Sequence, residues 1–381
     1  MPPASTDSRT ALATELDAAR HATHALLAPF EDEELQTQWS PLQSPLVWDL
    51  AHIGYFEDSW IGQRIGGLDP LLAEGDDLYD AFAHERAGRG ELALLDPAAA
   101  RDYLERVRDR TLRTLEDAPL DGDDPLLRRG FVFGLVVQHE RQHQETLLQT
   151  IQLSGLPHPG GAPAPVSTEG ESELAAGRYA VGTDDAPWAY DNERPAHMVD
   201  VGAFAIDRRP ITTAEFGAFV ESGGYADERC WSSEGAAWRA EENATAPLHW
   251  ESGTVIRFGR EEPLDPDEPV QHVSFHEAEA YARWAGKRLP AEQEWEAAAK
   301  AGALSGIGEV WEWTSSPFAA YPSFYAFPYP EYSEVFFGDE YRVLRGGSWA
   351  THPLVARPTF RNWDYPIRRQ IFAGVRCARD L

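Results

Sequence analysis

Apolar residues recur at the spacing of an amphipathic α-helix through most of the first 153 residues. The clearest stretch runs from Arg9 to Leu27, and Thr6 or Asp7 is placed to cap its first turn. Further helices are predicted from about Pro45 through Phe56, from about Pro97 through Leu112, and from Leu126 to Leu153. Four helices of this length, joined by connections of variable length, are typical of an up-and-down bundle.

The pattern changes after the fourth helix. Residues 154–172 read SGLPHPGGAPAPVSTEGES, where proline and glycine dominate and no periodicity survives, which predicts a linker. From Glu173 onward, short apolar runs and frequent turns predict strands at Arg178–Gly182 and Ala203–Asp207, short helices at Thr212–Ser222 and His276–Ala285, and a strand with a Gly-Gly bend at Tyr341–Trp349. We therefore expect a helical domain over 1–153, a linker over 154–172 and an α+β domain over 173–381.

Composition narrows the class of protein. The chain has 381 residues, and its 33 basic and 63 acidic side chains give a formal net charge of -30, which repels nucleic acid and anionic membrane surfaces. No apolar stretch approaches the length of about eighteen residues that a membrane span needs, and the polar N-terminus lacks a secretory signal core. Because the chain has only two cysteines, we expect no disulfide framework. We expect a cytoplasmic location for the same reason. The sequence does not indicate the oligomeric state, and a monomer is compatible with it.

The strongest chemical signal is the segment QHERQHQETLL at residues 138–148. His139 and His143 are four residues apart, so on a helix they share one face, which also carries apolar residues and points into the bundle. His52, in LVWDLAHIGYFE, is flanked by apolar residues on another predicted helix and is the candidate third ligand. An isolated pair of this spacing is more often structural, but an inward face favours a metal. Zinc would take this set with a water, and iron(II) would keep up to three positions open, so the spacing leaves both metals possible.

Several longer segments carry a family resemblance. YRVLRGGSWA (341–350), RPTFRNWDYPIRRQIFAGVRCA (357–378), SPLVWDLAHIG (44–54), DNERPAHMVDV (191–201) and the His-x3-His-x-Glu around His139 resemble the ergothioneine-biosynthesis sulfoxide synthases, also called hercynine oxygenases. The resemblance covers nearly the whole chain. It implies an α+β multidomain protein, with an N-terminal DinB-like four-helix bundle and a C-terminal domain like the formylglycine-generating enzyme, which has a C-type-lectin-like fold.

The same resemblance implies the reaction. Iron(II), held by His52, His139 and His143, would serve the coupling of a thiol to imidazole C2 of hercynine (Nα-trimethylhistidine), with O2 as oxidant and a sulfoxide as product. The thiol of the best-matching branch is that of γ-glutamylcysteine. The substrate contacts that the resemblance implies are Gln142 and Asn362 for the hercynine carboxylate, Trp363 for its trimethylammonium, and Arg86, Asp364 and Arg368 for the charged ends of γ-glutamylcysteine.

Tyr329, in YPEYSEVFF, matches the catalytic tyrosine of the family, which donates a proton or hydrogen. Tyr325 and Tyr332 are rivals for this role, because the surrounding stretch is rich in tyrosine. The hypothesis therefore assigns the role to this segment, with Tyr329 as the preferred residue.

Other functions stay open at this stage. One is the same chemistry with free cysteine, against which Asp364 and Arg368 argue, and another is a non-catalytic metal-bearing binding protein. A formylglycine-generating oxidase is a third alternative, which relies on two nearby cysteines. Cys377 matches the second of these cysteines, but residues 361–363, where the first is expected, contain no cysteine. The chain also departs from the family where only AGALSGIGE (301–309) joins two segments that a longer stretch usually connects. The residues carried over from the family lie outside that short segment.

Overall fold

The computed structural model describes the backbone of residues 6–381 and the side chains from residue 8 onward. The chain divides into two compact units, residues 1–158 and residues 159–381. The division falls inside the stretch 154–172 that was interpreted as a linker, although the first strand of the second unit already begins at Glu171. The predicted cap at Thr6 or Asp7 lies outside the described side chains.

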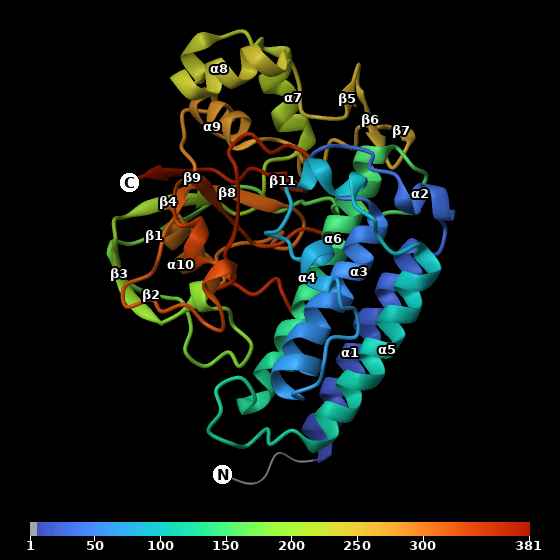
Figure 1. Cartoon of the computed structure of the whole chain (residues 1–381). Coiled ribbons are helices and arrows are strands. Elements are labelled where there is room, and N and C mark those ends of the chain that lie inside the picture. The colour runs from blue at the N-terminus through green and yellow to red at the C-terminus, as the bar shows by residue number, and fades with distance from the viewer. Residues whose placement is uncertain (1–5) are drawn as a thin grey trace. The chain divides into compact units, whose positions relative to one another are not determined.

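The first unit is helical. Its α-helices are α1 (Thr6–Leu27), α2 (Asp32–Gln36), α3 (Leu46–Glu57), α4 (Gly75–Tyr79), α5 (Pro97–Asp117) and α6 (Phe131–Ser154), with a π-helix at Asp58–Ile65 and 3-10 turns at Arg86–Glu91 and Arg128–Gly130. The long helices α1, α3, α5 and α6 lie side by side (Figure 1), and α3 packs on both α5 and α6. This is the predicted four-helix bundle. None of the described helices is long and apolar enough to cross a membrane.

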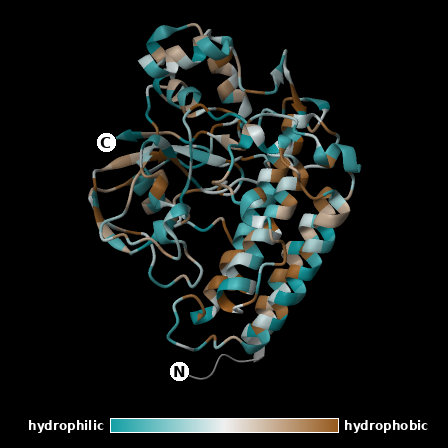
Figure 2. Cartoon of the chain, in the orientation of Figure 1, coloured by the Kyte–Doolittle hydropathy of each residue, from teal (hydrophilic) through white to brown (hydrophobic). Residues whose placement is uncertain are grey.

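The amphipathic pattern explains how these helices pack. Figure 2 shows hydrophobic and hydrophilic residues alternating in bands along them, and the apolar bands supply the buried core of the bundle. Two fully buried carboxylates, Glu57 on α3 and Glu140 on α6, are each bound by Arg20 of α1 and Arg108 of α5. One ionic cluster therefore ties the four long helices together behind their apolar surfaces.

The helix boundaries differ from the predictions at three points, and the first is that α5 ends at Asp117 instead of Leu112. The last long helix begins at Phe131 instead of Leu126, because Arg129 and Gly130 adopt left-handed backbone angles, with φ of 58° and 71°. A side chain at Gly130 would also meet Leu12, whose Cδ1 lies 2.7 Å from the position of a Cβ. At the third point, the chain continues beyond α3 as the π-helix, which the periodicity did not indicate.

The second unit mixes short helices and strands. Its helices are α7 (Thr213–Glu221), α8 (Ser233–Glu242), α9 (Phe275–Trp284) and α10 (Glu292–Lys300), and its 3-10 turns are Asp191–Glu193, Glu228–Cys230, Pro330–Tyr332 and Glu334–Phe336. Its strands are β1 (Glu171–Leu174), β2 (Gly177–Val181), β3 (His197–Val201), β4 (Phe204–Asp207), β5 (Trp250–Glu251), β6 (Thr254–Arg257), β7 (Arg260–Pro263), β8 (Trp311–Phe318), β9 (Gly338–Arg345), β10 (Asn362–Asp364), β11 (Ala373–Gly374) and β12 (Ala378–Asp380).

The strands form small sheets, in the orders β1-β4-β12, β10-β9-β8-β11, β2-β3 and β5-β6-β7. The helices predicted at 212–222 and 276–285 are α7 and α9, which begin at capping boxes made by Thr212 with Glu215 and by Ser274 with Glu277. The strand predicted at 341–349 ends at Arg345, and the Gly-Gly bend follows it with positive φ at both glycines. The predicted α+β class is therefore confirmed.

Hydrogen bonds fix the short segment 301–309 to other parts of the second unit. The Ser305 backbone N–H and hydroxyl both donate to the carbonyl of Arg208, and the guanidinium of Arg376 donates to the Ser305 carbonyl. Arg376 is fully buried and also pairs with Glu312 of β8. The shortened connection is thus held against β4 and β8 by specific contacts.

Candidate metal centre

Two helices bring the three candidate histidines together. His52 lies on α3, and His139 and His143 lie one turn apart on α6. One ring nitrogen from each lies within 4.8 Å of the others, and Nε2 of His52 is 3.2 Å from Nε2 of His139. Among the described residues, this is the one cluster of three or more histidine, cysteine or acidic side chains with such spacing. The sequence predicted this cluster from two histidines on one helix and a single histidine on another, and the structure brings the three together.

Hydrogen bonds orient two of these rings. Nδ1 of His52 lies 2.7 Å from the carbonyl oxygen of Tyr79, and Nδ1 of His143 lies 3.0 Å from a carboxylate oxygen of Asp49. Both partners are acceptors, so each Nδ1 is a donor and Nε2 is the nitrogen of each ring that is left for a metal. Sequence reasoning missed Asp49, although it precedes His52 by three residues and so shares its helical face.

Burial sets the charge of these rings. Desolvation, and then the neighbouring imidazoles, lower the pKa of His52 and of His139 well below the ordinary value. Both rings are therefore neutral near pH 7, which is the form that binds a metal. Phe56 stacks on His139 at a centroid distance of 3.8 Å and Trp48 stacks on His52 at 4.7 Å, so aromatic side chains fix the ring planes.

The donor set fits a divalent transition metal. Nε2 of His52 and Nε2 of His139 are 3.2 Å apart, close enough for both to direct their lone pairs at one cation. Three imidazoles suit iron or zinc, and the cluster of described residues includes no carboxylate ligand. Three protein ligands would leave further coordination positions for substrates. The residues present therefore fit the expected iron(II), while their chemistry alone does not select it over zinc.

The candidate substrate residues of the helical unit lie close to the histidines in sequence or in space. Gln142 is half-buried on α6, directly before His143. Arg86 is exposed at the start of a 3-10 turn, and among the described contacts its guanidinium has one long hydrogen bond, 3.5 Å to the carbonyl of Leu42. Arg89, which sequence reasoning did not single out, is buried 3.7 Å above the ring of Trp48. Arg86 can therefore accept an anionic partner, whereas Arg89 supports the stack behind His52.

The candidate residues of the second unit lie on and after the edge strand β10. Asn362 and Asp364 are two residues apart and share one face of the strand, so Trp363 projects to the opposite face. Trp363 stacks on Phe318 at a centroid distance of 4.2 Å. Asp364 forms an ion pair of 3.5 Å with Arg368. The structure thus brings Asp364 and Arg368 together. It places Trp363 and Asn362 on opposite faces of β10, although the resemblance assigns these two residues to the same substrate.

The three candidate tyrosines differ in environment. Tyr325 is 66% exposed, and Tyr329 is half-buried with its ring 6.2 Å from that of Tyr332. Tyr332 stacks on Tyr190 at 4.1 Å, and burial, together with Tyr190, raises its pKa well above the ordinary value. Tyr332 is therefore the least suited of the three to donate a proton to a substrate.

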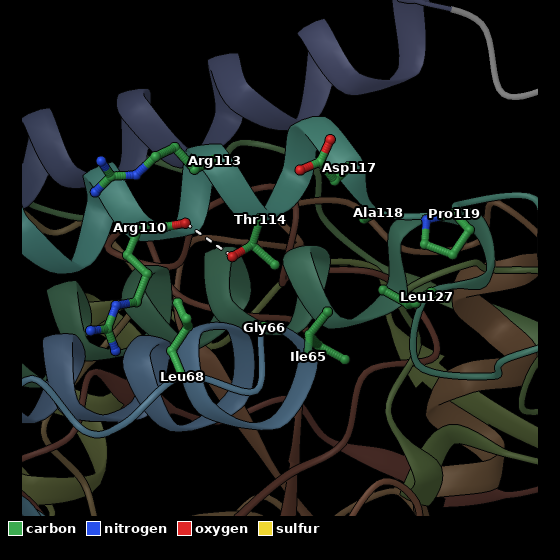
Figure 3. A pocket seen from close by; sticks show the side chains of 10 residues that line it. All are labelled: Ile65, Gly66, Leu68, Arg110, Arg113, Thr114, Asp117, Ala118, Pro119 and Leu127. Carbon is green, nitrogen blue, oxygen red and sulfur yellow. Dashed lines mark hydrogen bonds between the residues drawn. The ribbon is translucent and has the colours of Figure 1, made fainter.

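A separate pocket of the helical unit contains none of these residues. It measures about 660 Å³ and lies between the π-helix and α5 (Figure 3). Its lining comprises Ile65, Gly66, Leu68, Arg110, Arg113, Thr114, Asp117, Ala118, Pro119 and Leu127. Arg110 is already paired with Asp58, 2.9 Å away. The pocket offers no group of the kind that activates a thiol or O2, so the histidine cluster remains the candidate centre.

Comparison with known families supports the division into two parts. Residues 15–147 match the DinB superfamily, and residues 159–306 and 304–381 match the sulfatase-modifying factor enzyme 1-like domain. The second match is divided inside the short segment 301–309. The formylglycine-generating enzyme of Streptomyces coelicolor is 36% identical over 183 residues, which is 40% of this chain and 54% of that enzyme.

Other relatives match along nearly the whole length. The hercynine oxygenase of Mycolicibacterium thermoresistibile is 44% identical over 435 positions, covering 98% of this chain and 95% of that protein. The hercynine oxygenase of Mycobacterium tuberculosis is 45% identical over 438 positions, covering 97% and 99%. Both alignments are longer than the 381 residues of this chain, so these relatives carry segments that it lacks. The chain belongs to the hercynine oxygenase family of enzymes.

Proposed function

We propose that this protein is an iron(II)-dependent sulfoxide synthase of ergothioneine biosynthesis, which joins the thiol of γ-glutamylcysteine to imidazole C2 of hercynine. The C2–H and S–H bonds break, a C–S bond forms, and one oxygen atom of O2 enters the sulfoxide while the other leaves as water. When bound, iron(II) supplies the site at which the thiolate is activated and O2 is reduced. The observation that supports this proposal most strongly is the cluster of three histidines, in which desolvation keeps His52 and His139 neutral, in a chain that resembles hercynine oxygenases over nearly its full length.

The chain's own residues would divide the remaining work. His52, His139 and His143 hold the metal, while Asp49 and the Tyr79 carbonyl keep two of the rings in the ligating tautomer. Gln142 and Asn362 would bind the hercynine carboxylate, and Trp363 would contact its trimethylammonium. Because Phe318 covers one face of the Trp363 ring, the trimethylammonium would have to meet the other face.

The thiol substrate can be tested against its rival. γ-Glutamylcysteine has two carboxylates and an ammonium, which two arginines and one aspartate complement, so Arg86, Asp364 and Arg368 favour it over free cysteine. We expect kcat/KM for γ-glutamylcysteine to exceed that for cysteine. Arg86→Ala should raise KM for the dipeptide by roughly ten-fold or more, with KM for hercynine unchanged, since it removes one charged contact. Equal kcat/KM values for the two thiols would transfer the proposal to cysteine.

The oxygenase activity itself is tested with anaerobically iron-loaded protein, to which hercynine, thiol and O2 are added. Sulfoxide formation with stoichiometric O2 consumption is expected. His139→Ala should lose the iron, whereas His21→Ala, at an exposed position of α1, should retain it. Stoichiometric iron in the His139 variant would contradict the metal site, and absence of O2 consumption with either thiol would leave a metal-bearing binding protein.

We propose Tyr329 as the residue that donates a proton during O2 reduction. Tyr329→Phe should lower sulfoxide formation and divert the thiol to sulfinic acid, while Tyr325→Phe and Tyr332→Phe serve as matched controls from the same segment. A changed product ratio in the Tyr325 variant instead would move the role to that residue. We also propose a cytoplasmic location, which the two free, buried cysteines support.

A further inference from the structure

A single buried carboxylate binds both ends of residues 327–333, the tyrosine segment, which carries Tyr329. Asp191 lies in the 3-10 turn Asp191–Glu193 and is 2% exposed. Its carboxylate accepts a hydrogen bond from the backbone N–H of Phe327 at 3.2 Å and another from the hydroxyl of Ser333. The bonded residues bracket Tyr329 and Tyr332, and Tyr325 lies two residues before the first of them.

No cation in the described part of the chain compensates the burial of Asp191. Among the described residues, no arginine, lysine or histidine pairs with it, and burial raises its pKa to about 6. Glu193, two residues on, differs because Arg357 and Thr359 bind it. Burying a carboxylate without a cation is costly. The groups that offset this cost for Asp191 are the backbone N–H groups of its own turn, at Asp191 and Asn192, together with Ser333 and Phe327 at the two ends of residues 327–333.

The residue before Asp191 adds a second attachment. Tyr190 stacks on Tyr332 at 4.1 Å with 13° between the ring planes, and the ring of Tyr332 meets Trp363 edge-on at 5.7 Å. The adjacent pair Tyr190 and Asp191 therefore links the tyrosine segment to β10, which carries the candidate substrate residues. The 3-10 turns Pro330–Tyr332 and Glu334–Phe336 contain no buried residue, and Tyr325 and Val335, on either side of residues 327–333, are 66% and 55% exposed.

We propose that Asp191 is a positioning residue, which fixes residues 327–333 so that the hydroxyl of the reacting tyrosine stays in one place during the reaction. This inference rests on the proposed function, because it takes the reacting tyrosine to lie in this segment. The carboxylate acts through the backbone of Phe327 and the side chain of Ser333, and it does not touch the substrate itself.

The test uses the full chain and two independent measurements on Asp191→Ala. Amide hydrogen exchange of the iron-free protein should show about ten-fold faster exchange at Phe327, the factor expected from losing a hydrogen bond to a charged acceptor. Exchange in α6 should not change. The iron-loaded variant should keep its iron and shift its products from sulfoxide toward sulfinic acid, in the direction of Tyr329→Phe.

Further variants separate positioning from loss of fold. Ser333→Ala removes one of the two bonds and should give a smaller effect of the same kind. Asp191→Asn keeps one acceptor and should partly restore the product ratio. Asp200→Ala removes a carboxylate that is 90% exposed, and it should match the wild-type protein in both measurements.

The outcomes are distinct. Unchanged exchange at Phe327 in both the Asp191 and Ser333 variants overturns the attachment, and faster exchange with an unchanged product ratio overturns the positioning role. If the wild-type protein forms no sulfoxide, the proposed function fails, while the exchange measurement still decides whether Asp191 holds the segment.

Discussion

Removing the carboxylate of Asp49 should weaken metal binding without removing a ligand. Asp49 is 1% exposed, and one of its oxygens lies 3.0 Å from Nδ1 of His143 while the other has no hydrogen-bond partner among the described residues. The carboxylate therefore serves mainly to orient the imidazole. Losing such a partner commonly lowers metal affinity by about 10- to 100-fold, which corresponds to about 1.4–2.7 kcal/mol of binding free energy.

The assay is a competition titration of Asp49→Ala with a divalent metal and a chelator under anaerobic conditions. Asp49→Asn retains an acceptor for the Nδ1 proton, so its affinity should lie between those of the wild-type protein and Asp49→Ala. Asp58→Ala is the matched control, because Asp58 is equally buried but binds Arg110 instead of a histidine. If Asp49→Ala binds metal within two-fold of wild type, or if Asp58→Ala weakens binding equally, the orienting role is wrong.

Three further predictions concern charge and burial. Glu57 is fully buried, and although burial alone would raise its pKa, Arg108 and a second arginine hold it at about 2. Acidification from pH 4.5 toward 2 should therefore lower the unfolding free energy of the wild type by an amount on the order of 3 kcal/mol. Glu57→Gln should not show this loss in urea unfolding, and parallel pH profiles of the two proteins would contradict the prediction. Asp191 has the opposite sign, since burial raises its pKa to about 6, so the wild type should lose up to about 3 kcal/mol relative to Asp191→Asn as the pH rises from 4 to 7. A constant difference between these two proteins would refute the assignment. Burial raises the pKa of both Cys230 and Cys377, so neither should react with a thiol reagent before unfolding, and Cys377→Ala should keep its sulfoxide synthase activity; loss of that activity with an intact fold would favour cysteine-based oxidation.

Much of the fold follows from local pattern. The four long helices follow from apolar spacing, and α7 and α9 from the caps at Thr212 and Ser274. The late start of α6 was not predicted, because it depends on left-handed backbone angles at Arg129 and Gly130 and on the packing of Leu12. The short strands of the second unit were mostly missed, since strands of two to four residues carry too little alternation to be recognised.

The sequence by itself determined that His139 and His143 share a helical face, because the period of the helix places residues i and i+4 together. Its longer motifs determined the family. Only the tertiary structure decided that His52 meets them and that Asp49 and the Tyr79 carbonyl orient the rings. These contacts join residues 27 to 94 positions apart, and such pairings depend on how helices pack, which no local pattern specifies.

The same distinction applies to the second unit. The motif RNWD identified Asn362, Trp363 and Asp364 as a group, but strand alternation sends the tryptophan to the other face, where Phe318 covers it. The link from Asp191 to Ser333 spans 142 positions and has no signature in the sequence around either residue. Local sequence motifs thus identified the candidate reactive residues. Long-range packing decided which of these residues lie together and which other residues hold them in place.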